Sequence, residues 1–414
     1  MKIKTRYKQK ITIDYFKLLV LDALVFINVL LESMYSEIES ISRIVRIFRY
    51  LNFALMFFLV LIIKRQRQSR LVIVAIMLAF SIINYLFKNG SIGLMMALGV
   101  FLICNDLSSQ KIVLHTIIAS IVSYSFVIIS SLFGIIENVK IVRYLSIGIW
   151  QGRYDRQALG FQFPNQIPLM LFYVAAVVII GLKEEFKFKQ AIILVAINLV
   201  VYSFCNARTP FLLVTILIVV SLLYQKCNSS KKYVCMIPLI LTPILFIGSF
   251  VLTIGYKSIS FIQKMDVVFN YRFSSAYLTI KHWGITLFGS GSEAGTKETD
   301  IKNSFVNGFS VNVDNGYITF LLQYGLILSI MLFGIFIVMS FRIYYYRDGY
   351  FAIAFSMILF SNIIDANLVS FKMWPIVLLC FTDYKTIDYQ KLIENVITKY
   401  KKKSPQILKL YTKS

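Results

Sequence analysis

The chain has 414 residues, of which 58% are hydrophobic and only 15% are charged, and its formal net charge is +23. Soluble domains rarely exceed about 50% apolar residues and carry about 25% charged ones, so the composition excludes an ordinary soluble domain and indicates a membrane protein. Lys and Arg in cytoplasmic loops account for the positive charge. A nucleic-acid partner is not expected, because no basic stripe with interleaved aromatic residues occurs.

Apolar stretches close to the roughly 20 residues of a spanning helix recur from end to end. The sequence therefore predicts an all-α polytopic membrane protein with about 12 transmembrane helices. Four of the predicted spans, the fourth, seventh, eighth and last, are short. The predicted spans are Lys17–Leu31, Ile47–Ile63, Leu71–Phe87, Ser91–Cys104, Ile112–Phe133, Ile167–Leu182, Ala191–Cys205, Phe211–Tyr224, Val234–Tyr256, Tyr317–Phe341, Tyr350–Ile364 and Phe371–Thr382.

The connections between these spans differ in positive charge, which predicts their orientation. With the N-terminus inside, the short Lys/Arg-rich connections, such as Lys64–Arg70, fall on the cytoplasmic side. The C-terminal tail, with its basic run Lys399–Lys403, falls there too, so both termini are predicted to be cytoplasmic. The basic start Met1–Lys10 lacks a small-residue cleavage site and is expected to lead into a retained first helix.

Two long segments fall outside, namely Gly134–Gln166 and residues 257–316 between the ninth and tenth helices. The chain thus divides into residues 1–256 with nine helices, the large loop 257–316, residues 317–382 with three helices, and the tail 383–414. Within the large loop, Ser260–Trp283 is predicted as one surface helix, because its apolar residues recur at three- and four-residue steps. Loops of this length in a compact protein are usually functional or disordered.

Arginines stand out in the outer segments. Arg153 and Arg156 precede Pro164-Asn165, which opens the sixth helix, and Arg208 lies in the short turn before the eighth. A purely structural interpretation also stands: Asn165 caps the helix and the arginines anchor it at the interface. The Thr-Pro pair after Arg208 explains a helix start but not the arginine, which near membrane depth normally has an anionic partner.

The large outer loop supplies the remaining candidates. Arg272 and His282 lie on the predicted surface helix, and Asp314, Asn315 and Tyr317 lie at the entry to the tenth helix. Structural alternatives are that Arg272 binds lipid phosphates and that Asp314 or Asn315 caps the helix. The functional interpretation is a carboxylate, Asp314, that accepts a proton from an attacking hydroxyl group.

Other polar residues carry less information. The two histidines lack cysteine or carboxylate neighbours at ligand spacing, so neither a metal site nor a cofactor is predicted. The five cysteines, which form no C-x-x-C pair, are interpreted as small core residues. Intramembrane Asp22 and the turn Asp365–Asn367 receive no role. Outer arginines suit phosphate oxygens, so the outer face fits glycosyl transfer from a lipid diphosphate.

In their order and placement these motifs resemble the Wzy-type polysaccharide polymerases and the related O-antigen ligases. The resemblance runs from Arg153 to Gly325 and rests on three elements. These are Arg153/Arg156 with Gly160 and Pro164-Asn165; Arg208 in a short outer turn; and Arg272, Leu287-Phe288-Gly289-Ser290-Gly291, Asp314-Asn315-Gly316-Tyr317 and Tyr324-Gly325 around one large outer loop.

The resemblance implies an inverting, metal-independent glycosyltransferase that uses undecaprenyl-diphosphate-linked oligosaccharides. It implies that Arg208 and Arg272 bind the donor diphosphate, with Arg153 or Arg156 assisting, and that Asp314 is the catalytic carboxylate. Asn165, His282, Asn315 and Tyr317 would contact substrate. The ligases commonly have histidine where this chain has Asp314, which favours a polymerase.

By this resemblance the chain is expected to be a multi-pass protein of the bacterial plasma membrane. It would join lipid-linked repeat units into capsular, exopolysaccharide or O-antigen chains on the outer face, among membrane lipids. A chain-length regulator and a flippase of the same pathway would be further partners. The alternatives are an O-antigen-type ligase, a lipid-linked oligosaccharide flippase, and a scaffold without catalysis. The lack of an internal repeat weakens the flippase reading.

Overall fold

In the computed structural model of the chain, the described residues are 2–62, 68–88, 92–104, 106–147, 150–226, 231–268, 271–291, 313–368 and 370–381. The polar part of the predicted outer loop at 292–312 lies outside these residues, as does all of the predicted C-terminal tail, 383–414.

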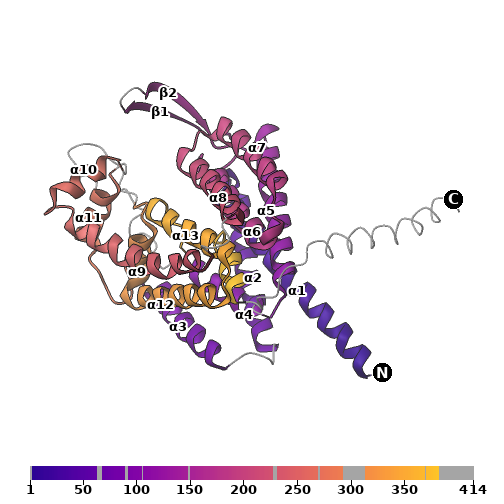
Figure 1. The fold of residues 1–414 in the computed structure, drawn as a ribbon. Coiled ribbons are helices and arrows are strands. Elements are labelled where there is room, and N and C mark those ends of the chain that lie inside the picture. The colour runs from indigo at the N-terminus through magenta and orange to yellow at the C-terminus, as the bar shows by residue number, and fades with distance from the viewer. Residues whose placement is uncertain are drawn as a thin grey trace, which may run out of the picture.

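Helices form most of the described chain (Figure 1). Each of the 12 predicted spans overlaps one of them. Those helices are α1 (Lys2–Leu31), α2 (Glu39–Ile62), α3 (Gln68–Lys88), α4 (Gly93–Cys104), α5 (Ser109–Leu132), α6 (Gln166–Leu182), α7 (Phe188–Cys205), α8 (Arg208–Lys226), α9 (Lys231–Gly255), α12 (Gly316–Tyr346), α13 (Gly349–Ile364) and α14 (Trp374–Phe381).

The helices have the length and the outward faces of a membrane protein. Among the described residues, 6 helices (α5, α6, α7, α8, α9 and α12) are long and apolar enough to cross a membrane. By contrast α4, α13 and α14 have 12, 16 and 8 residues, fewer than the roughly 20 of a full span. Large apolar side chains are exposed along α7 and α9, as expected for surfaces in contact with lipid.

Helix α13 lies at the centre of the bundle. It contacts α6, α8, α9 and α12, and most of its side chains are buried. A helix that is apolar all round, as this one is, must be covered on every side. Its last residue, Ile364, is followed by Asp365, so the central helix delivers a carboxylate to one end of the bundle.

The connections gather at two opposite ends, and the segments predicted to be outside gather at one of them. Contacts at this end join segments far apart in sequence: Met34 N donates to Gly160 O, Arg156 to Cys205 O, Asn165 to Asp365, and Lys372 pairs with Glu32. Contacts at the other end join predicted cytoplasmic segments: Lys17 with Asp106, Lys111 with Asp14, and Lys183 with Asp348. The N-terminal part of α1 projects on the side opposite α10 and α11 (Figure 1).

The first outer segment adds the one pair of strands in the described residues of an otherwise helical protein, a feature that the sequence analysis did not predict. Residues 134–166 contain an antiparallel pair of strands, β1 (Lys140–Ile147) and β2 (Trp150–Gln157). The pair stands out from the bundle (Figure 1), and β2 contacts α7. Strand β1 is rich in aromatic and β-branched residues, and β2 carries aromatic residues among polar ones. These compositions favour a half-exposed pair of strands.

The prediction of one surface helix over Ser260–Trp283 was wrong. The segment forms two helices, α10 (Ser260–Val268) and α11 (Arg272–Trp283). Tyr271 has φ 61°, a left-handed conformation that ends helical continuity. The short 3-10 helices η1 (Met34–Glu37) and η2 (Lys183–Glu185) complete the described elements.

Candidate functional site at the predicted outer end

Two predicted site residues meet at the predicted outer end, although 42 positions separate them. Arg272, the first residue of α11, donates from Nε and Nη2 to Asp314 Oδ2 at 3.3 and 3.2 Å. Both bonds reach the same carboxylate oxygen, which leaves Asp314 Oδ1 outside this pair. The Arg272 side chain is 20% exposed and that of Asp314 is 51% exposed, so the pair lies at a surface.

Arg272 is positioned by a buried carboxylate that sequence analysis missed. Asp266, on α10, accepts hydrogen bonds from the N–H groups of Phe273 (2.7 Å) and Ser274 (3.3 Å) in the first turn of α11. These amides have no partner within their own helix, and negative charge is favourable at a helix N-terminus. Asp266 therefore caps α11 from outside and fixes the helix end that carries Arg272.

A second carboxylate lies near this pair. Asp365 follows the central helix α13, and Asn165 Nδ2 donates to its Oδ2 at 3.4 Å. Burial raises the pKa of the Asp365 carboxyl, and the nearby Asp314 raises it further, while Lys372 and Arg272 lower it. Asn165, predicted to cap α6 or to contact substrate, thus contacts this carboxylate, and its side chain makes no cap bond.

Asn315 and Tyr317 hold the start of α12. Asn315 is 1% exposed, and its side-chain oxygen accepts from the N–H groups of Tyr317 and Ile318. The structural alternative for Asn315, a helix cap, is therefore confirmed. The Tyr317 hydroxyl donates to Leu359 O at 2.7 Å in the buried interface between α12 and α13. Both side chains are therefore engaged within the protein, where they fix the start of α12 against α13.

Arg156 and Arg208 belong to a second group at the turn between α7 and α8. Arg156 Nε donates to Cys205 O at 3.2 Å, and Asn206 follows in a left-handed conformation with φ 46°. Arg208 is the first residue of α8. The strand β2 thus brings its arginine against the turn that carries Arg208. Arg153 lies opposite Tyr144 in the β-hairpin, and its side chain is outside the described part of the structure.

His282 lies apart from the Arg272–Asp314 pair. It sits in the last turn of α11, where its ring packs edge-on against Trp283 at 5.5 Å. Ten residues of helix separate it from Arg272, which corresponds to about 15 Å along the axis. The helix therefore holds the two residues at opposite ends.

Helix α12 is broken at Gly325, and a loop segment fills the break. Gly325 has φ 86° and ψ 175°, which interrupts the helix. The segment Thr286–Gly291 docks there through Ser290 N to Leu322 O (2.8 Å) and Leu326 N to Thr286 O (3.0 Å). Buried Asn84 of α3 donates to Gln323 O and Phe288 O at 2.8 and 2.6 Å. Backbone groups freed by the break are thereby satisfied, as membrane depth requires.

The two glycines at this contact face each other. An added Cβ on Gly289 would lie 2.2 Å from Gln323 O, and one on Gly325 would lie 2.3 Å from Gly289 N. Both also have positive φ. The Gly-Ser-Gly turn and the Tyr324-Gly325 pair, quoted above for the resemblance, therefore form one packed unit.

The remaining sequence predictions concern cysteines, histidines and metals. Cys104, Cys205, Cys235 and Cys380 are buried and free, as predicted for core residues. His115 bonds Asp22 at 2.8 Å. Within the part of the chain that the structure describes, no group of three or more His, Cys, Asp or Glu residues could hold a metal ion.

Comparison with known proteins adds no relative. No protein-family model matches the chain, and no curated protein and no solved structure matches it.

Proposed function

We propose that the chain is a polysaccharide polymerase that joins lipid-diphosphate-linked oligosaccharides at the outer face of the bacterial plasma membrane, as the sequence resemblance implies. In this proposal the protein crosses the membrane 12 times with both termini in the cytoplasm. The observation that carries the proposal is the meeting of Arg272, Asp314 and Asp365 at the bundle end assigned to the outside by loop charge.

In the proposed reaction a sugar hydroxyl of the acceptor attacks the anomeric carbon of the donor. The hydroxyl proton passes to a carboxylate, a new C–O bond forms, and the bond to the diphosphate breaks with its electron pair leaving on the diphosphate. Arg272 and Arg208, the first residues of α11 and α8, stabilise the negative charge on this leaving group. Inversion follows from a single displacement.

Asp365 is the better placed proton acceptor of the two carboxylates. Asp314 Oδ2 already accepts two hydrogen bonds from the Arg272 guanidinium, whereas the Asp365 carboxyl has a long contact with Asn165 at 3.4 Å and a hydrogen bond from the backbone of Ala366. Burial raises the pKa of Asp365, and a base is more effective when its pKa approaches the working pH. We therefore assign Asp314 to positioning Arg272 and Asp365 to the proton transfer, a change from the role that the resemblance implies for Asp314.

The test is the lipid-linked glycan profile of cells that lack the protein, with the membrane leaflet assayed. Single repeat units stranded on the outer leaflet support a polymerase. Long lipid-linked chains that never reach a final acceptor would indicate a ligase instead, and single units trapped on the inner leaflet would indicate a flippase.

Complementation then tests the residues. Asp365→Asn should leave single units, and Arg272→Lys and Arg208→Lys should slow polymer formation, because lysine keeps the charge but lacks the guanidinium fork. The matched control is Arg43→Lys on α2, whose side chain is 73% exposed and pairs only with Glu39 one turn away. Full-length polymer at normal rates from all three site variants would contradict the mechanism.

A further inference from the structure

An apolar cavity of about 550 Å³ lies between α3, α4, α12 and α14. Each of these helices lines it, through residues such as Met77, Phe101, Gly334 and Leu378. Figure 1 shows α3 alongside α12, and the two helices are in contact. A Cβ added at Gly334 would meet no atom within 4 Å, so α12 faces open space there. Val338, which also lines the cavity, is 48% exposed, so the cavity opens at the surface of the bundle.

One end of this cavity carries a positive charge. Arg342, close to the C-terminal end of α12, is the one charged residue in the lining that the structure describes. Its Nε donates to Cys380 O at 2.9 Å, and its guanidinium lies over the rings of Tyr346 and Phe381 at 5.5 and 5.6 Å. These contacts fix the position of a long side chain. The cavity therefore combines hydrocarbon walls with one positioned cation.

The cavity has the depth of one membrane leaflet. On α12 its lining runs from Met331 to Arg342, which corresponds to about 16 Å of helix. The hydrocarbon core of a bilayer is about 30 Å thick, so the cavity extends through about half of it. Its cation lies at one end of this depth, as the phosphate of a lipid does.

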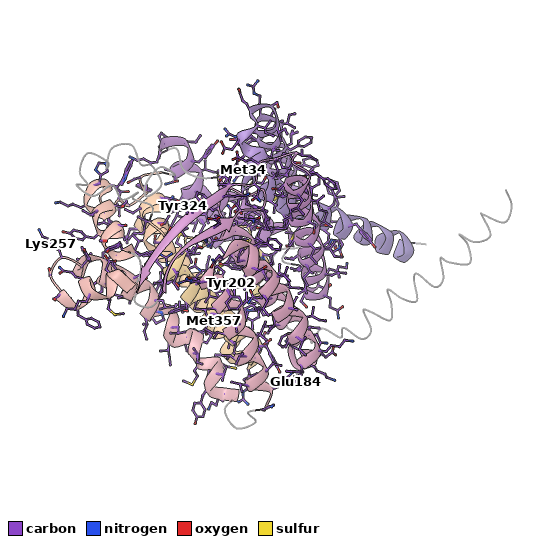
Figure 2. All side chains as sticks on the ribbon, turned by 90° about the horizontal axis from the view of Figure 1, so that it is seen from above. Met34, Glu184, Tyr202, Lys257, Tyr324 and Met357 are labelled. Carbon is purple, nitrogen blue, oxygen red and sulfur yellow. The ribbon has the colours of Figure 1, made fainter. Side chains whose placement is uncertain are left out.

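Arg342 lies towards the end of the bundle opposite to the proposed site. Helix α12 starts at that site and runs to the other end, where Asp348 pairs with Lys183 at 2.7 Å. Figure 2 shows Glu184, the neighbour of Lys183, far from Lys257, which precedes α10 of the large loop. The predicted orientation places the Lys183 end in the cytoplasm, so Arg342 lies at the level of the cytoplasmic leaflet.

We propose that this cavity binds one acyl chain of an anionic phospholipid from the cytoplasmic leaflet, with the lipid phosphate at Arg342 and the chain along α12 towards Met331. A guanidinium binds phosphate oxygens through charge-assisted hydrogen bonds, and anionic lipids of the cytoplasmic leaflet attract cations at this level. An unfilled cavity forfeits the dispersion contacts of its walls. An acyl chain that enters from the bilayer restores them.

The position of the cation distinguishes this lipid from the substrate of the proposed reaction. That reaction needs a diphosphate beside Asp365, at the other end of α12. A lipid with its phosphate at Arg342 has its head group on the opposite side of the membrane. The phospholipid is therefore a structural ligand that packs against α14, a helix of only 8 residues. Its binding does not depend on transfer chemistry.

The test is native mass spectrometry of the purified full-length chain in detergent, titrated with phosphatidylglycerol or with zwitterionic phosphatidylcholine. Phosphatidylglycerol should bind the native chain about tenfold more tightly, because choline offsets the charge of its own phosphate. Arg342→Gln should abolish this preference, since glutamine keeps a donor for Cys380 O but removes the charge. Gly334→Leu fills the cavity and should weaken the binding of both lipids about tenfold.

The chain offers a matched control for each variant. Arg43→Gln removes an arginine whose side chain is 73% exposed on α2. Gly248→Leu adds the same side chain on α9, where an added Cβ also meets no atom within 4 Å. Both controls should bind the two lipids as the native chain does. Arg342→Lys keeps the charge and should retain part of the preference, which separates loss of charge from a folding defect.

The proposal is overturned if the native chain binds the two lipids equally, or if Arg342→Gln and Gly334→Leu bind them as the native chain does. Undecaprenyl phosphate, whose methyl-branched chain is wider than an acyl chain, should compete weakly. Displacement of phosphatidylglycerol by undecaprenyl phosphate at equal concentration would also overturn the proposal. Asp365→Asn should bind phosphatidylglycerol normally, so failure of the proposed function leaves this result unchanged.

Discussion

The docking of Thr286–Gly291 into the break of α12 can be tested by one methyl group. In Gly289→Ala the new Cβ would lie 2.2 Å from Gln323 O, closer than the 3.0 Å that real Cβ atoms respect, and φ is +83°. Gly284→Ala is the matched control, since Gly284 has φ +69° but open space around its Cβ position. The comparison separates steric overlap from backbone strain.

The expected magnitudes follow from these contacts. An alanine at positive φ costs about 1–3 kcal/mol; Gly284, with φ 69° and ψ 171°, lies in a region that is essentially restricted to glycine. At Gly289 the overlap with main-chain atoms also forces the segment outwards. The four main-chain hydrogen bonds of Ser290, Gly291, Leu326 and Ile327 across the break then weaken, at about 1 kcal/mol each. We expect Gly284→Ala to lower the free energy of unfolding by about 1–3 kcal/mol and Gly289→Ala by about 3–6 kcal/mol.

Unfolding of the detergent-solubilised chain, followed by heating and by titration with a denaturing detergent, gives the stability difference. Hydrogen exchange at the Leu326 and Ile327 amides reports the docking itself, because these amides donate to Thr286 O and Leu287 O. Exchange there should accelerate in Gly289→Ala and stay slow in Gly284→Ala. Equal stability losses in the two variants, with unchanged exchange, would refute the docking argument.

Four further predictions concern charged residues. Burial, aided by the nearby Asp314, raises the pKa of Asp365, so the folded state favours the protonated carboxyl and loses stability as pH rises through the folded-state pKa. Asp365→Asn should therefore raise the thermal midpoint of unfolding at neutral pH, while glycosyl transfer is lost. A lowered midpoint would contradict this reasoning. For the same reason native transfer should fall as pH drops through the raised pKa, as measured by rate–pH profiles. Asp266→Ala should lower stability by about 1–2 kcal/mol through loss of the cap and should reduce transfer, with partial rescue by Asp266→Asn. Lys372→Met should lower the free energy of unfolding by about 1–3 kcal/mol, because it leaves the Glu32 carboxylate unpaired. The double variant with Glu32→Gln should recover part of this loss, as measured by thermal unfolding.

The helical segments could be predicted from the sequence because the hydrophobicity of each segment is a local property. Every predicted span overlaps a helix, since long apolar runs need no distant partner to be recognised. The break between α10 and α11 could not be found this way. The three- and four-residue apolar steps continue through it, and the cause is Asp266, whose side chain bonds amides 7 and 8 residues further on.

The candidate site was predictable only in part, because its contacts are long-range. Arg272 and Asp314 were singled out separately, and the fold pairs them. Asp365 was seen but given no role, since nothing nearby in sequence explains it and its partner Asn165 is 200 positions away.

The position of α13 connects these features. A helix of 16 residues is too short to cross a membrane alone, but its burial among four neighbours means that its end is surrounded by protein rather than lipid. Asp365 at that end can therefore be held, partly enclosed by protein, beside Asn165 and the start of α12. The close approach needs Gly316, where an added Cβ would lie 3.0 Å from Asn362 Oδ1 and 3.2 Å from Asp365 O. Gly316 and Ala366 also line a polar cavity of about 260 Å³, so the packing that positions the carboxylate also shapes the cavity beside it.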